Sequence, residues 1–342
     1  MAPTNRLRTA VRRCRRAVSR RLPGESTSAD DSGRAVADGG TVTATDEGSS
    51  LFSRDFLESL PFWLPPTLLM GFFVYGAIGW NAIISLTDWT SFGTPDYGSL
   101  DLSQYGQLWS DPAFWTAAQN TVVLLLAFTV ACLLIGLGLA ILIDQGIRFE
   151  NAFRTIYLLP MSLSFVVTAK FWSWMYNSQY GVINATLRGV GLDFLTAEWL
   201  ADPSIVLGAV IFALLWQFSG YAMVVYLAGL RAIPSEHFEA ARVDGATTLR
   251  MYWRVVIPQL RSSTISAAVV LMVFALKAFD FLFVMFGKYP GPGADILAVM
   301  MYRQAFSSLQ WAYASAVAMT LFVMALIIVG PYLYWEYRRG EL

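Results

Sequence analysis

The chain has 342 residues, of which 56% are hydrophobic and 14% are charged, and its mean hydropathy is +0.51. This composition is far more apolar than that of a soluble protein of similar length, so we expect a membrane protein. The formal net charge is zero, but the charged residues are distributed unevenly along the chain. With only two cysteines, Cys14 and Cys132, the sequence excludes a disulfide framework and a four-ligand zinc site of the usual kind.

Residues 1–50 form a polar segment that is rich in arginine at first and acidic later. A secretory signal would continue such a basic cluster with an apolar core, whereas here a Ser/Gly/Asp-rich run follows. We therefore expect a disordered cytoplasmic tail, whose arginines contact anionic lipid or hold the N-terminus in the cytoplasm. Nucleic-acid binding is disfavoured because no aromatic or groove-reading element accompanies the arginines. Residues 51–62 are predicted to form a short interfacial helix.

Six apolar stretches follow, each close to the roughly twenty residues that a bilayer requires. One such stretch could be a core helix of a soluble protein, but six in series indicate an all-α integral membrane domain over residues 63–342. The expected spans are 64–86, 118–143, 155–176, 205–230, 264–286 and 311–335.

The orientation follows from the lysine and arginine residues, because positive charges resist translocation. Basic residues concentrate in the tail, in the 144–154 turn, in the polar loop 231–262 and at the C-terminus, which all fall on one side of a six-pass topology. The segments on the other side hold only three: Arg188, Lys288 and Arg303. We expect both termini and the polar loop to be cytoplasmic, on the side where ATP is found.

The loop 231–262 has the signals of a helix–turn–helix. Ser235 is expected to cap the first helix, and Gly245 supplies the backbone freedom that a reversal needs. Ala240 and Ala241 are small enough to let another protein surface approach the backbone of the first helix.

The second helix of this loop is predicted to begin at Thr247 or Thr248. Pro258 is expected to end it near Val256, because the residue before a proline is pushed out of the helical region. Its apolar face would consist of Leu249, Tyr252, Trp253 and Val256, with Arg250 and Arg254 beside it.

This stretch, EAARVDGATTLRMYWRVVIPQL, resembles the EAA loop of ABC-importer permeases. In that family the loop is the coupling element that sits in a groove of the cytosolic ATPase subunit, whereas the alternative is an ordinary amphipathic cytoplasmic loop. The resemblance implies an ABC type I importer permease fold of six transmembrane helices with a cytoplasmic EAA helix-turn-helix. It implies ATPase coupling through Glu239, Ala240, Ala241, Asp244, Gly245, Ala246, Arg250 and Pro258.

Further motifs resemble the carbohydrate permeases of the maltose and glycerol-phosphate type, in particular the first of two unlike permease subunits. They include Phe153–Pro160, Gly181–Asn184, Leu227–Leu230 and Tyr302–Phe306. The implied protein is the transmembrane subunit of an ATP-driven sugar importer that works by alternating access. Its implied partners are a second permease subunit, two cytosolic ABC ATPase subunits, an extracellular solute-binding protein and membrane lipids.

The residues offer little for catalysis. No Gly-x-x-x-x-Gly-Lys-Ser/Thr loop is present, since Gly287-Lys288 is followed by tyrosine, and a Ser-His-Asp triad would need His237, the one histidine. We expect a non-catalytic permease with no metal or cofactor of its own, and ATP and Mg bound by partner ATPase subunits. Alternatives are a permease for glycerol phosphate or another polar solute, a facilitator or channel, and, least favoured, a membrane enzyme.

Polar residues within the predicted spans are candidates for the substrate pathway, because a charge at the bilayer centre costs about 2.5 to 3.5 kcal/mol. Lys277 and Asp280 are three residues apart on a predicted helix and would either pair with each other or leave Asp280 to accept sugar hydroxyls. Trp172 would either stack on a sugar ring or anchor the chain at the interface. A polar notch in the fourth span contains Gln217, Ser219 and Tyr221.

Overall fold

The computed structural model describes residues 54–146 and 148–339, and every regular element in these ranges is a helix. The predicted tail, residues 1–50, lies outside the described residues. The chain divides into two units after Phe62, and the second unit is Trp63–Leu342. In the first unit the described residues are helical, and they begin α2 (Arg54–Met70), which continues past the predicted end of the interfacial helix at residue 62.

Five helical stretches of the described chain are long and apolar enough to cross a bilayer. They are Ser59–Ile84, Pro112–Asp144, Val206–Ala232, Arg261–Phe286 and Trp311–Pro331. A sixth span is present if the bent pair Glu150–Ser162 and Phe165–Met175 is taken as one. The predicted all-α membrane fold is therefore confirmed.

The third span differs from the continuous helix that we predicted over 155–176. It consists of α6 (Glu150–Leu158), a 3-10 turn η2 (Leu159–Ser162) and α7 (Phe165–Met175), and its two halves are bent by 99°. Pro160 lies in the 3-10 turn, where its ring and its missing N–H prevent a regular helix from continuing. Ser164 then caps α7 by accepting a hydrogen bond from the Val167 N–H at 3.3 Å. We call Glu150–Met175 the broken third span.

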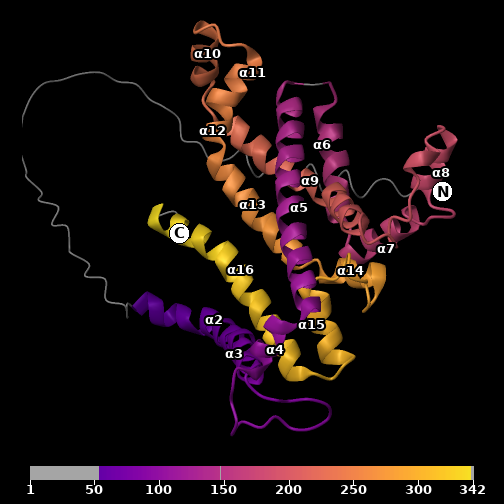
Figure 1. Cartoon of the computed structure of the whole chain (residues 1–342). Coiled ribbons are helices and arrows are strands. Elements are labelled where there is room, and N and C mark those ends of the chain that lie inside the picture. Colours follow the sequence, from indigo (N-terminus) through magenta and orange to yellow (C-terminus); the bar gives the residue numbers. More distant parts are fainter. Residues whose placement is uncertain (1–53, 147, 340–342) are drawn as a thin grey trace, which may run out of the picture. The chain divides into compact units, whose positions relative to one another are not determined.

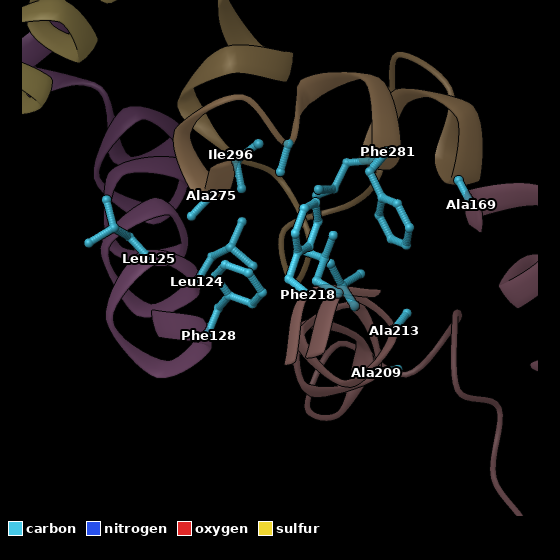
Figure 2. Packing of buried hydrophobic residues seen from close by; sticks show 14 of the residues in the cluster. Leu124, Leu125, Phe128, Ala169, Ala209, Ala213, Phe218, Ala275, Phe281 and Ile296 are labelled. Carbon is cyan, nitrogen blue, oxygen red and sulfur yellow. The ribbon is translucent and has the colours of Figure 1, made fainter. Parts of the chain in front are cut away.

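The other helices of the apolar spans are α5 (Pro112–Asp144), α9 (Val206–Ala232), α13 (Arg261–Leu276) with α14 (Phe279–Phe286), and α16 (Trp311–Arg339). The centre of the second unit is the packing of α5 on α9. Figure 2 shows Leu124 and Phe128 of α5 directed toward Phe218 of α9. The rings of Phe128 and Phe218 meet edge to face with centroids 5.9 Å apart. Such close packing holds membrane helices together, since burial from water contributes little between segments that are already in lipid.

Gly136 makes the approach of α5 to α9 possible. A Cβ atom at this position would overlap the Ala222 side chain and the backbone of Met223 in α9, whereas one at Gly138 would meet no atom within 4 Å. The helix pair therefore depends on a missing side chain at residue 136 and tolerates one at residue 138.

The two ends of the second unit are built differently (Figure 1). At one end the turn after α5 meets the loop that contains the predicted EAA motif. At the other end, the loop after α14 returns to α5, where Asn120 Nδ2 donates to the Pro292 carbonyl at 2.8 Å. Arg303 of α15 (Leu297–Phe306) holds the same loop by donating to both Asp295 carboxylate oxygens at 2.6 and 3.2 Å. Which end faces the cytoplasm stays a prediction.

Replacing Gly136 with valine should destabilise the protein by about 1 to 3 kcal/mol, because the added side chain forces α5 away from α9. Gly138→Val introduces the same side chain one half-turn along the same helix and is the matched control. Thermal unfolding in detergent should show a lower midpoint for Gly136→Val alone. Equal midpoints for the two variants would contradict this account of the helix contact.

Candidate functional site: the polar hairpin and the candidate pathway

The loop with the EAA motif forms a hairpin over residues 235–259, which we call the polar hairpin. Its first helix is α10 (Ser235–Val243). Pro234, with φ −57° and ψ 138°, occupies the cap position, so the expectation that Ser235 caps the helix is wrong. A proline suits the start of a helix because the first N–H groups have no partner inside the helix.

The reversal after α10 agrees with the role expected for Gly245, whose φ is +71°. The Ala246 N–H donates to the Ala241 carbonyl and the Gly245 N–H to the Arg242 carbonyl, each at 3.0 Å. These bonds satisfy carbonyls at the end of α10 and need a left-handed residue, which glycine adopts without strain.

The second half of the polar hairpin contains α11 (Thr248–Met251), a π-helical turn η4 (Tyr252–Val256) and α12 (Ile257–Gln259). Thr247 caps it, since its hydroxyl accepts from the Arg250 N–H at 3.4 Å. The helical path continues past Val256 and through Pro258, contrary to our prediction that it stops there. A wider π turn just before the proline accommodates the hydrogen bond that proline cannot donate.

The predicted apolar face of the second helix is split between two sides. Tyr252 and Val256 are buried, in a cluster that also includes Ile143 of α5 and Leu230 of α9. Leu249 and Trp253 are 79% and 72% exposed, and their spacing of four residues places them on one helix face. One side of the polar hairpin therefore attaches it to the membrane body, and the other presents large apolar side chains outward.

The candidate coupling residues are divided in the same way. Glu239, Ala240, Asp244, Gly245, Arg250 and Pro258 are exposed, Ala246 is partly buried and Ala241 is buried. Ala241 belongs to the buried cluster that the hairpin shares with α5 and α9, so of this pair of alanines Ala240 is the one exposed to another surface.

A cavity of about 530 Å³ separates part of the polar hairpin from the end of α5. Asp144 and Gly146 line it from the α5 side, and Phe238, Arg242 and Tyr252 line it from the hairpin side. Burial and the Asp144 carboxylate raise the pKa of Tyr252, while Arg242 lowers it by a smaller amount.

Two of the candidate pathway residues are buried where the broken third span meets α9. Trp172 is 4% exposed and lies among Phe212, Tyr176 and Trp216, so it does not present a free face to a sugar ring here. Gln217 is 2% exposed, and its Nε2 donates to the Leu163 carbonyl at 2.8 Å.

The other four candidate residues are not brought into one cluster by direct contacts. Ser219 is buried and Tyr221 is half-buried in α9, whereas Lys277 and Asp280 are exposed. The helix is interrupted at Lys277–Ala278, between α13 and α14, and the ion pairs among the described residues do not include Lys277 with Asp280. Exposed charges within an apolar span indicate a partner chain or a water-filled path.

The sequence reasoning missed an ion-pair cluster at the base of the polar hairpin. Glu150 accepts hydrogen bonds from Arg154, at 2.9 Å, and from Arg231. The Glu150–Arg154 spacing of four residues is a signal that the sequence does contain. Arg231 lies 81 residues from Glu150, so nothing local in the sequence links them. Within the described ranges, no group of three or more His, Cys, Asp or Glu side chains is placed to hold a metal ion.

The structure combines several apolar helices long enough to span a membrane, a broken span and a polar hairpin with an outward apolar face, as expected of a membrane permease subunit. The family model for the inner membrane component of binding-protein-dependent transport systems matches residues 132–334, which include the hairpin. The chain belongs to this family, which confirms the resemblance seen in the sequence.

Relatives support this assignment over most of the chain. The chain is 55% identical over 307 residues to the xylose/arabinose import permease protein XacH of Haloferax volcanii, covering 87% of this chain and 96% of the relative. It is 31% identical over 267 residues to the multiple sugar-binding transport system permease protein MsmF of Streptococcus mutans, covering 78% and 91%.

A solved structure has the same fold. It is a bacterial alginate ABC transporter in complex with an alginate pentasaccharide-bound periplasmic protein. The TM-score is 0.71 at 23% sequence identity, over 83% of this chain and 95% of the matched one.

Truncation of the two neighbouring aromatic residues in the polar hairpin should have different effects on stability. Tyr252→Ala removes a buried ring and should lower the free energy of unfolding by about 3 kcal/mol, whereas Trp253→Ala should change it by less than about 0.5 kcal/mol. Thermal unfolding of the two purified variants checks this expectation. A larger loss for Trp253→Ala than for Tyr252→Ala would show that the two faces have been assigned the wrong way round.

Proposed function

We propose that this chain is one of two permease subunits of an ATP-driven sugar importer, and that the polar hairpin transmits work from cytosolic ATPase subunits to the membrane spans. The observation that carries the proposal is the outward face of the hairpin. Leu249 and Trp253 expose large apolar surfaces on a helical segment whose exposed side also carries Arg250 and Arg254. Such a patch on an ordered element is typical of a protein-binding surface.

The attachment of the hairpin supports its use as a mechanical connection. Its inner face packs on α5 and α9, and α9 leads into α10 after two residues, Ile233 and Pro234. A force on the outward face therefore reaches α9 directly. Glu239 and Ala240 are exposed on α10, where the charge would be matched by the ATPase groove and the small side chain would allow close approach.

The chemical energy would come from ATP and Mg held by two ATPase subunits, since this chain has no phosphate-binding loop of the P-loop type. An extracellular binding protein would deliver the solute, and a second permease would complete the pathway. If the two faces are coupled, nucleotide binding inside changes the affinity for the binding protein outside and the reverse. We expect this coupling to appear as stimulation of ATP hydrolysis by the loaded binding protein. The polar hairpin and both termini would then lie in the cytoplasm, as the distribution of basic residues indicates.

The names of the relatives favour a sugar, and the 55% identity to a xylose/arabinose permease favours a pentose. In the pathway, Asp280 would accept hydrogen bonds from sugar hydroxyls, and Tyr221 and Ser219 would contribute further polar contacts. The exposed Lys277 supports a second candidate, a permease for glycerol phosphate or a similar anion, because a phosphate requires cationic partners.

Asp280→Ala should reduce sugar uptake by about ten- to a hundredfold, because the lost hydrogen bonds involve a charged acceptor. Uptake of labelled D-xylose, L-arabinose and glycerol 3-phosphate by cells with the complete transporter is the measurement. Asp193→Ala, a change of the same kind at an exposed residue of the short 3-10 helix η3 (Asp193–Leu195), is the control. Unchanged transport and affinity in Asp280→Ala would reject its role. Uptake of glycerol 3-phosphate but of neither sugar would replace the sugar assignment.

Changes on the outward face of the polar hairpin should release the ATPase subunits. Glu239→Lys and Trp253→Ala should lower the amount of ATPase that co-purifies with the permease by about tenfold or more, the scale of an interface hot spot. Phe194→Ala truncates an equally exposed aromatic ring outside the hairpin and is the control. If both hairpin variants keep the full amount of ATPase and full solute-stimulated hydrolysis, the hairpin is not the docking element.

A further inference from the structure

The broken third span lies along α9 and is attached to it at three levels. At the level of the polar hairpin, Glu150 in the first turn of α6 forms ion pairs with Arg154 and Arg231. Arg154 belongs to the same helix as Glu150, whereas Arg231 lies in the last turn of α9, three residues before Pro234. Within the ranges that the structure describes, Arg231–Glu150 is the one ion pair that joins these two segments.

The second level is the break itself. Gly220 of α9 lies so close to Tyr157 at the end of α6 that a Cβ atom would overlap the Tyr157 carbonyl. Three residues earlier in α9, Gln217 donates to the carbonyl of Leu163, between η2 and α7. Backbone groups that leave a helix inside a membrane need such partners, since lipid offers none. The amide of Gln217 therefore holds the irregular backbone against α9.

The third level is at the end of α7. The Tyr176 hydroxyl donates to the Ala209 carbonyl, near the start of α9, at 2.9 Å. Trp172, one turn earlier in α7, contacts the rings of Phe212 and Trp216. The broken span thus follows α9 along most of its length in spite of the 99° bend.

We propose that the broken third span moves together with α9, and that the Arg231–Glu150 pair transmits movement of the polar hairpin to the first turn of α6. Arg231 and Gln217 are then positioning residues, one at the base of the hairpin and the other at the break, and Gln217 does not bind the sugar. This inference rests on the proposed function, because it assumes that the hairpin is moved by an ATPase.

Two features distinguish this role from simple support of the fold. The Arg231 and Glu150 side chains are 49% and 27% exposed, and a pair at this level of exposure adds little to stability. Its position is nevertheless specific, because it joins the residues next to the hairpin to the first turn of α6. Loss of the pair should therefore affect coupling while leaving assembly intact.

The test uses the complete transporter, with its partner subunits and binding protein, reconstituted with D-xylose and L-arabinose as solutes. Arg231→Gln should lower the ratio of solute-stimulated to basal ATP hydrolysis by about threefold, a loss on the scale of one half-exposed pair. Basal hydrolysis and assembly should remain as in the unchanged protein. Arg154→Gln removes the other partner of Glu150 but leaves the link between the helices, so it is the matched control and should keep the normal ratio.

A double-mutant cycle isolates the pair. Glu150→Gln should lower the ratio as Arg231→Gln does, and the double variant should show no further loss, because the two residues act through one contact. Normal coupling in Arg231→Gln, or an equal loss in Arg154→Gln, would overturn the inference. Both results leave the proposed function standing as long as the unchanged transporter shows sugar-stimulated hydrolysis. The absence of such stimulation by any sugar in the unchanged transporter would instead contradict the proposed function.

Gln217→Leu provides an independent readout. If Gln217 is a positioning residue, Gln217→Leu should lower kcat for uptake and leave KM for the transported sugar unchanged. An increase in KM at constant kcat would identify Gln217 as a sugar ligand and overturn its assignment here.

Discussion

The close contact of α9 with its neighbours is the constraint on which the rest of the structure depends. Gly136 of α5 and Gly220 of α9 provide space where any side chain would overlap the opposing helix. Without the close approach of α9 at Gly220, the break in the third span would leave backbone carbonyls unpaired in lipid, at a cost of several kcal/mol each. The Gln217 side chain donates a hydrogen bond to one of these carbonyls, that of Leu163. The irregular backbone of the third span therefore explains why α9 has a glutamine at this position.

The same helix explains why the polar hairpin has two different faces. Tyr252 and Val256 fasten the hairpin to α5 and α9, and this anchorage keeps Leu249 and Trp253 directed away from the membrane body. A hairpin that is rigid on one side and apolar on the other is suited to transmit force rather than to bind a small solute. Family membership, a fold shared with a solved ABC transporter and this geometry agree on a permease that works with an external source of energy.

The sequence predicted the features that depend on local patterns. Apolar segments of the required length predicted the spans, and Gly245 and Thr247 predicted the turn of the hairpin and the start of its second half. Pro160 could have indicated a break in the third span. The sharp bend also depends on α9, because Gln217 and Gly220 of α9 contact the irregular backbone. The helical path through Pro258 depends on a π turn, which has no clear sequence signal.

The site could be predicted less completely, because its side chains meet residues that are distant in the sequence. Trp172 was a candidate for sugar stacking, yet four aromatic rings surround it in the fold. The ion pair between Glu150 and Arg231 was not predicted, because 81 residues separate the two in the sequence. The roles of the candidate coupling residues, and of Lys277 and Asp280 in transport, stay predictions.

The central claim is that the polar hairpin binds an ATPase subunit. Site-specific cross-linking in the assembled transporter tests this claim most directly. In a background with Cys14 and Cys132 replaced by serine, Leu249→Cys would be treated with a short bifunctional reagent, with Phe194→Cys as the comparison. The account predicts a covalent product of Leu249→Cys with the ATPase subunit that changes in yield when ATP binds, and none from Phe194→Cys. An assembly that hydrolyses ATP in response to solute but gives no ATPase product from Leu249→Cys would contradict it.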